Sequence, residues 1–140
     1  MEYYEVKRTI AAPPERIWRV LTDAVALVEG NTGITRIDGN IALNEKIKLF
    51  TEVSPRSFAL KVTEFEPDRR MVWQGGMPLG LFKGVREFNL TLTDDGTEFH
   101  MREEFSGPLL GLIWKSMPDL GPSFEQFADA LHDMTRADDT

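Results

Sequence analysis

The middle of the sequence alternates between apolar and polar residues with a period of two, and this alternation constrains the fold more than any other feature. Turn-forming clusters interrupt it at Asp38-Gly39-Asn40, Ser54-Pro55, Pro67-Asp68 and Asp95-Gly96. Alternation bounded by such clusters is typical of strands joined by tight turns. The pattern predicts strands over residues 33–38, 45–53, 57–66, 69–77, 82–94 and 96–106. Consecutive strands with short connections predict an antiparallel meander.

The stretch IAAPPERIWRVLTD, residues 10–23, ends a further strand over 3–11 and begins a short helix. Pro13 and Pro14 cannot donate to a strand ladder, but proline is tolerated in the first turn of a helix. The apolar residues that follow lie on one helical face: Ile17, Trp18, Val20 and Leu21. A second short helix, Ala24 to Glu29, is expected to end at Gly30-Asn31.

The tail from Leu109 to Ala137 has helical periodicity, which Pro118, Gly121 and Pro122 should kink or interrupt. Its apolar stripe comprises Phe124, Phe127, Ala128, Leu131 and Met134. A sheet with one apolar face needs a cover, and this is the only long amphipathic element. We therefore expect one α+β domain over 1–140, a seven-stranded antiparallel sheet curved around the C-terminal helix. The two short helices after the first strand would close one end of the space between sheet and helix.

Strand parity predicts which side chains face that space. With Asp95-Gly96 as a two-residue hairpin turn, the inner pairs are Leu92–Phe99, Leu90–Met101, Phe88–Glu103 and Arg86–Phe105. With a turn at Pro67-Asp68, they are Glu64–Met71, Val62–Trp73, Leu60–Gly75 and Phe58–Met77.

Arg86 and Glu103 break this apolar face. (Glu64 also lies on it, but beside a turn, where it would be solvated.) In this register Arg86 and Glu103 are diagonal neighbours within reach of each other. A buried charge is costly unless it is paired. Three interpretations stay open: a structural ion pair at the mouth of the sheet, a polar handle that orients an apolar ligand, or acid–base chemistry by Glu103.

Composition excludes several classes of protein. A net charge of −7 and a pI near 4.8 disfavour nucleic acid as a partner and electrostatic binding to anionic lipid headgroups. The absence of cysteine excludes disulfides and thiolate chemistry. His100 and His132 have no metal-ligand spacing, so we expect neither a metal nor a cofactor. With no signal peptide and no apolar run long enough to span a bilayer, we expect a cytoplasmic protein without integral membrane association.

One loop carries unusual chemistry. The glycine-rich segment 75–80 precedes no helix, which argues against a phosphate cradle. The apolar side chains of residues 77–82 either pack on the last helix or form a gate or contact surface.

The chain resembles the START-like, or SRPBCC, superfamily, in particular its polyketide cyclase/dehydrase and lipid transport branch. The stretches that carry the resemblance are VKRTIAAPPERIWRVLTD, VTEFEPDRRMVWQGG, LFKGVREFNLTLTDDGTEFHMREEFSG and the closing amphipathic helix. It implies the helix-grip fold and a hydrophobic tunnel that holds a lipid, polyketide, sterol-like or aromatic ligand. Relatives often have histidine where this chain has Arg86, so the resemblance transfers no catalytic set.

Three functions follow as hypotheses. The first is a carrier or sensor that binds a hydrophobic small molecule between sheet and helix. Its expected lining is Phe58, Leu60, Val62, Trp73, Arg86, Phe88, Leu90, Phe99, Met101, Glu103, Phe124, Phe127 and Leu131. The second is a polyketide cyclase/dehydrase-like enzyme that uses Glu103 and Arg86. The third is a protein-interaction role through residues 77–82. The large side chains could also fill the space, and the 33–38 edge strand could pair two copies in a homodimer.

Overall fold

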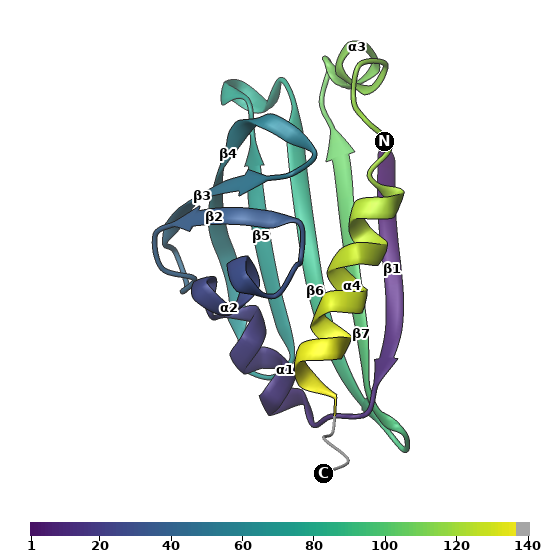
Figure 1. The fold of residues 1–140 in the computed structure, drawn as a ribbon. Coiled ribbons are helices and arrows are strands. Elements are labelled where there is room, and N and C mark those ends of the chain that lie inside the picture. Colours follow the sequence, from purple (N-terminus) through teal and green to yellow (C-terminus); the bar gives the residue numbers. More distant parts are fainter. Residues whose placement is uncertain (137–140) are drawn as a thin grey trace.

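The computed structural model, which describes residues 1–136, is built on one antiparallel sheet of seven strands in the order β1-β7-β6-β5-β4-β3-β2. The sheet curls, and a C-terminal helix lies along the β1–β7 side of its inner face (Figure 1). Two short helices lie at one end of the sheet, and a third short helix lies at the other. The predicted α+β helix-grip fold is confirmed.

The strands agree with the predicted ranges to within a few residues. They are β1 (Glu2–Ile10), β2 (Ile34–Asp38), β3 (Lys46–Thr51), β4 (Ser54–Glu66), β5 (Arg70–Gly76), β6 (Lys83–Thr93) and β7 (Gly96–Ser106). The helices are α1 (Pro14–Leu21), α2 (Ala24–Glu29), α3 (Leu110–Trp114) and α4 (Gly121–Thr135), with a 3-10 turn, η1 (Pro78–Gly80).

The helices α1 and α2 close one end of the space under the sheet, as expected. Proline opens α1, and the Asp23 side chain caps α2 by accepting hydrogen bonds from two backbone N–H groups. Trp18 of α1 packs edge-to-face on Phe65 of β4, with ring centroids 5.0 Å apart. Gly30 ends α2 where any side chain would collide with Met134 of α4, so the two helices can approach closely.

The predicted tail helix is divided in two. Residues 115–120 separate α3 from α4, and Pro118 lies in this break, where a helix would lose a hydrogen bond. The predicted stripe on α4 is buried except for the half-buried Met134. Arg8 of β1 holds α4 in place by ion pairs with Asp129 and, at 2.8 Å, with Glu125. The predicted helix end at residue 137 lies outside the described residues.

The register of the β6–β7 hairpin differs from the prediction by two residues. Asp94 and Asp95 form the loop, Thr93 pairs with Gly96, and Gly96 has a φ of +134°. The prediction placed Gly96 in the turn, but glycine here supplies the positive φ directly after it. Because the shift is an even number of residues, every side chain keeps its predicted face. The inner pairs become Leu90–Phe99, Phe88–Met101, Arg86–Glu103 and Gly84–Phe105.

A β-bulge between Val62 and Glu64 changes the register of the β4–β5 hairpin. The predicted pairs Val62–Trp73 and Leu60–Gly75 are confirmed. Beyond the bulge Glu64 lies opposite Val72 rather than Met71, and Phe65 takes the inner position. An extra residue in one strand reverses the facing of everything beyond it. Glu64 therefore lies on the outer face, where it contacts Arg70 at 3.3 Å.

Candidate functional site

A row of five side chains crosses the inner face of the sheet at one level. Cross-strand pairing joins Val62 to Trp73, Trp73 to Arg86, Arg86 to Glu103, and Glu103 to Tyr4. The row therefore spans β4, β5, β6, β7 and β1. It places two charged groups between aromatic neighbours, beneath the N-terminal half of α4.

Arg86 and Glu103 form an ion pair within this row. Arg86 Nε donates to Glu103 Oε1 at 2.6 Å, and the two side chains are 19% and 17% exposed. The pair is directly opposite rather than diagonal, because of the two-residue register shift. The Arg86 guanidinium also lies 4.9 Å from the ring centroid of Phe124 on α4, a cation–π distance. Strand pairing and the helix together therefore hold the guanidinium over the sheet.

The ion pair leaves hydrogen-bonding capacity unused. Within residues 1–136, Arg86 Nη1 and Nη2 and Glu103 Oε2 have no hydrogen-bond partner. The indole Nε1 of Trp73, a residue only 1% exposed, is also without a partner in this part of the chain. Buried donors without partners are uncommon in proteins. The row thus offers donors on one side and a carboxylate oxygen on the other.

Two glycines lie on the inner face of the sheet beside the ion pair. Gly75 and Gly84 lie opposite each other on β5 and β6, one level beyond the row. A Cβ on Gly84 would lie 3.1 Å from Glu103 Oε2, and a Cβ on Gly75 would lie 2.5 Å from Leu60 Cδ2. Any larger residue would displace the carboxylate or Leu60. Gly84 therefore leaves room for the Glu103 carboxylate, and Gly75 leaves room for the Leu60 side chain.

Aromatic rings from four elements and the loop before β6 border the pair on the side toward α3. Tyr4 lies 5.5 Å from Trp114 and 5.7 Å from Phe124, measured between ring centroids. Phe105 lies 5.6 Å from Trp114 and 6.0 Å from Phe82. This aromatic wall is apolar apart from the hydroxyl of Tyr4 and the indole N–H of Trp114. Strand parity in the two hairpins alone does not reach these rings. The same alternation in β1 would have placed Tyr4 on the inner face.

On the side toward α1, aromatic rings of the expected lining pack on one another. Centroid distances are 4.7 Å for Trp73–Phe88, 6.0 Å for Phe88–Phe127 and 6.1 Å for Phe99–Phe127. Most predicted lining residues are core residues, each at most 7% exposed: Val62, Trp73, Phe88, Leu90, Phe99, Met101, Phe124, Phe127 and Leu131. Leu60 is half-buried, and Phe58 is 42% exposed.

A surface hollow of about 570 Å³ lies elsewhere, on the outer side of α4. Its lining includes Gly30, Asn31, Pro122, Gln126 and Met134. It shares no residue with the predicted lining, and its walls are a mixture of polar and apolar groups. The candidate site is therefore the Arg86–Glu103 pair and the aromatic wall, rather than this hollow.

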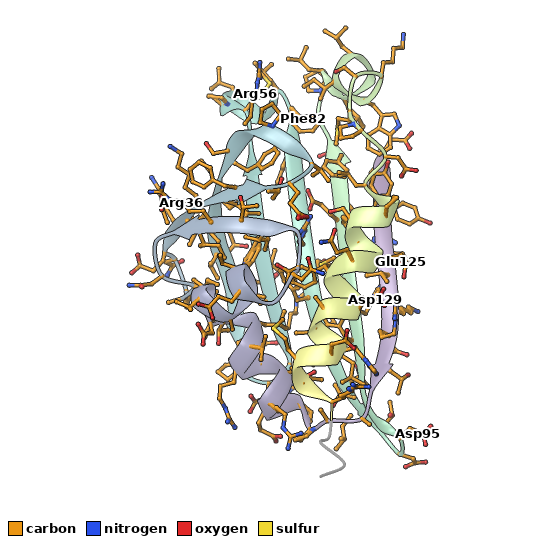
Figure 2. All side chains as sticks on the ribbon, viewed as in Figure 1. Arg36, Arg56, Phe82, Asp95, Glu125 and Asp129 are labelled. Atoms are coloured by element: carbon orange, nitrogen blue, oxygen red, sulfur yellow. The ribbon has the colours of Figure 1, made fainter. Side chains whose placement is uncertain are left out.

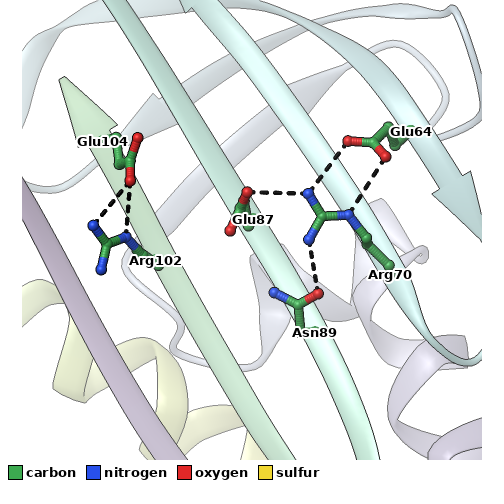
Figure 3. Close-up of polar contacts among 6 residues, drawn as sticks. All are labelled: Glu64, Arg70, Glu87, Asn89, Arg102 and Glu104. Carbon is green, nitrogen blue, oxygen red and sulfur yellow. Dashed lines mark hydrogen bonds and ion pairs between the residues drawn. The ribbon is translucent and has the colours of Figure 1, made fainter. Parts of the chain in front are cut away.

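The outer face of the sheet carries the remaining charge networks. Arg70 donates to Glu64, to Glu87 and to Asn89, while Arg102 pairs with Glu104 (Figure 3). Burial lowers the pKa of Arg70, but the hydrogen bonds to the two carboxylates outweigh it and the pKa is raised. These contacts join neighbouring strands, and we assign them to the stability of the sheet.

His100 is also on the outer face, as predicted. Its Nε2 lies 2.8 Å from Glu5 Oε2, and this hydrogen bond lowers the pKa of the Glu5 carboxyl. No three histidine, aspartate or glutamate side chains within residues 1–136 converge as ligands around a metal would.

The fold and the helix-facing polar row define a helix-grip protein. The chain belongs to the polyketide cyclase/dehydrase and lipid transport family, whose model matches residues 1–133. No curated protein matches the sequence. Across the described chain, every helix is too short or too polar to cross a membrane.

Solved structures share the fold at low sequence identity. The Aha1 dimer from Colwellia psychrerythraea has a TM-score of 0.76 at 19% identity and covers 100% of both chains. Protein MLL2253 from Mesorhizobium loti has a TM-score of 0.74 at 21% identity over 95% of this chain and 96% of its own. Protein jhp0584 from Helicobacter pylori has a TM-score of 0.75 at 18% identity over 96% of this chain and 86% of its own.

Proposed function

We propose that this protein binds an uncharged, mostly apolar small molecule, as a carrier or sensor, and that the Arg86–Glu103 pair anchors the one polar group of that molecule. The observation that carries the proposal is the ion pair itself, less than one-fifth exposed on a mostly apolar face. Ligand sites are typically apolar with a few convergent polar groups. The family, which includes lipid transport, supports the same class of ligand.

The charge balance of the pair favours an uncharged ligand. Arg86 and Glu103 neutralise each other, so a charged ligand group would leave one net charge in an apolar setting, which is unfavourable. The Arg86 N–H groups that have no partner within residues 1–136 suit a carbonyl oxygen, and the second oxygen of Glu103 suits a hydroxyl. A lipid, polyketide or aromatic molecule with a carbonyl or hydroxyl group fits these requirements.

The aromatic wall supplies the apolar contact in this proposal. Tyr4, Phe82, Phe105 and Trp114 border the pair on the side that the core rings leave free. Aromatic faces bind planar or aliphatic groups well because each ring offers a large apolar area at little cost in side-chain entropy. The ligand would lie between this wall and the row, with its polar group toward Arg86.

Binding of Nile red, an uncharged fluorescent molecule with one carbonyl group, tests the proposal. We expect saturable binding that Arg86→Met weakens at least tenfold, while Arg70→Met, on the outer face, leaves it unchanged. The fatty acid cis-parinaric acid should bind more weakly because of its charge. The proposal fails if Nile red does not saturate or if the two arginine variants behave alike. Native mass spectrometry of protein from its own host would identify the natural ligand.

A second candidate is an enzyme of the cyclase/dehydrase kind, favoured by the free Glu103 Oε2 above Gly84. This oxygen could accept a proton from a carbon next to a ligand carbonyl that Arg86 polarises. Glu103→Gln separates the two candidates. A carrier keeps its ligand affinity within a few-fold, whereas an enzyme loses turnover while it still binds.

A further inference from the structure

Exposed aliphatic side chains gather at the end of the sheet that carries η1 and α3. Leu79 is 97% exposed, Leu112 is 73%, Met77 is 43% and Leu81 is 37%. The two segments are joined, since the backbone N–H of Leu109 donates to the Leu81 carbonyl at 3.0 Å. Phe82 and Arg56 lie at the same end (Figure 2). We call residues 77–82 and 107–114 the apolar tip.

The conformation of Leu79 sets this tip apart from ordinary surface residues. Its φ is +59°, in the left-handed region that leucine rarely adopts. The side chain gains no packing in return, because it is almost fully exposed. Single exposed leucines are common on protein surfaces, but a group of them at one protruding end indicates a contact surface. The loop therefore projects from the molecule instead of packing on the last helix.

Charge is distributed unevenly between the two ends of the sheet. Residues 76–84 and 106–118 contain no acidic residue and two lysines, Lys83 and Lys115, in a chain with a net charge of −7. The hairpin turns at the other end carry Asp68, Asp94 and Asp95. The net charge alone predicts that anionic lipids repel this protein. The apolar tip, whose flanking charges are two lysines, should instead be attracted to anionic lipids.

We propose that the apolar tip docks on the surface of an anionic lipid bilayer. Aliphatic side chains flanked by lysines, on segments that contain no acidic residue, are the combination that binds the boundary between headgroups and acyl chains. The four side chains project from a loop and a short helix, a shape that suits insertion between lipids. This places the leucines in the bilayer and the acidic turns in water.

The position of the tip next to the candidate site supports a lipid surface over a protein partner. Phe82 belongs to the tip, and its ring stacks on Phe105 at 6.0 Å between centroids. Phe105 in turn contacts Trp114 and Tyr4 of the aromatic wall. An apolar ligand could therefore pass between a bilayer and the wall without crossing water. Docking itself goes beyond the proposed function, because it does not require the ligand.

Flotation with vesicles of equal parts phosphatidylcholine and phosphatidylglycerol tests the proposal on the ligand-free full chain. Leu79→Asp should weaken binding about tenfold or more, since the variant loses a leucine that would be buried in the bilayer and gains a negative charge, which the anionic lipid repels. Aspartate tolerates a positive φ better than leucine does, so this variant should fold normally, which circular dichroism checks. Leu92→Asp is the matched control, because Leu92 is a leucine 71% exposed at the opposite end, and it should bind as wild type.

Other measurements separate the alternatives. Binding to vesicles of phosphatidylcholine alone should be weaker, and added salt should weaken binding to the mixed vesicles. Equal binding by Leu79→Asp and wild type overturns the proposal. So does a self-association, seen by analytical ultracentrifugation, that Leu79→Asp abolishes while vesicles bind neither protein. Arg86→Met should float as wild type does, so a failure of the ligand proposal and a failure of docking are distinguishable.

Discussion

Replacement of the Arg86–Glu103 pair by apolar residues distinguishes a site kept for ligand binding from an ion pair kept for stability. The perturbation is a set of three variants: Arg86→Met, Glu103→Leu and the double substitution. Methionine keeps much of the apolar stem that packs on Phe124, so the change removes mainly charge and hydrogen bonds. Loss of one partner leaves the other charge in a largely apolar setting.

The expected magnitudes follow from the burial of the pair. Removal of one partner costs about 0.2–1 kcal/mol for exposed ion pairs and about 3–5 kcal/mol for buried ones. At 19% and 17% exposure the pair lies near the buried limit, so each single variant should lose about 2–3 kcal/mol. The double variant removes both charges, so its free energy of unfolding should lie within about 1 kcal/mol of the wild-type value, above or below it.

Urea unfolding followed by tryptophan fluorescence measures the free energy of each variant, with constant m values as the test of two-state behaviour. The reasoning is refuted if the double variant loses as much as the sum of the singles, because the two residues would then contribute independently and an unpaired charge would not be the cause of either loss. The double variant should also fail to bind Nile red. Stability retained with binding lost is the result that a ligand site predicts.

Three further changes test the fold. Phe127→Ala should lower the free energy of unfolding by about 3–5 kcal/mol in urea titrations, since the ring is only 2% exposed. Gly96→Ala should lower the free energy of unfolding by about 1–3 kcal/mol, because φ at this position is +134° and the new Cβ would collide with the Ile10 carbonyl oxygen. The hydrogen bond with His100 lowers the pKa of Glu5 below 4.5, so its stabilisation is present above that pH and is lost as the pH falls through the folded value. Thermal melts of Glu5→Gln should therefore vary less than wild type below about pH 4.5.

Periodicity in the sequence predicted the strands, their order and the covering helix because each depends on local patterns. The register of the two hairpins was harder to predict from the sequence. The position of Gly96 indicated a turn, but not whether glycine would lie inside the turn or just after it. The bulge near Thr63 had no signal in the alternation, since Glu64 and Phe65 are both compatible with either face near a turn.

Arg86 and Glu103 were singled out because they break the apolar face, and the structure joins them in an ion pair, directly opposite rather than diagonal. The surroundings of the pair depend on contacts between elements that are distant in sequence. Trp114 of α3 meets Tyr4 of β1, and Phe82 meets Phe105. Nor could parity separate a lining residue from a core residue, because both face inward. The contact between Phe88 and Phe127 likewise joins elements that are distant in sequence.

The bulge in β4 limits how this chain can change in length. Deletion of Thr63, the extra residue between Val62 and Glu64, would restore regular pairing and leave Glu64 opposite Val72 and Phe65 opposite Met71, on their present faces. Substitutions within the strand alter one contact at a time, whereas a deletion or insertion elsewhere in β4 exchanges the two faces on one side of the change. A change in the number of β4 residues outside the bulge therefore disturbs the fold more than a single substitution does.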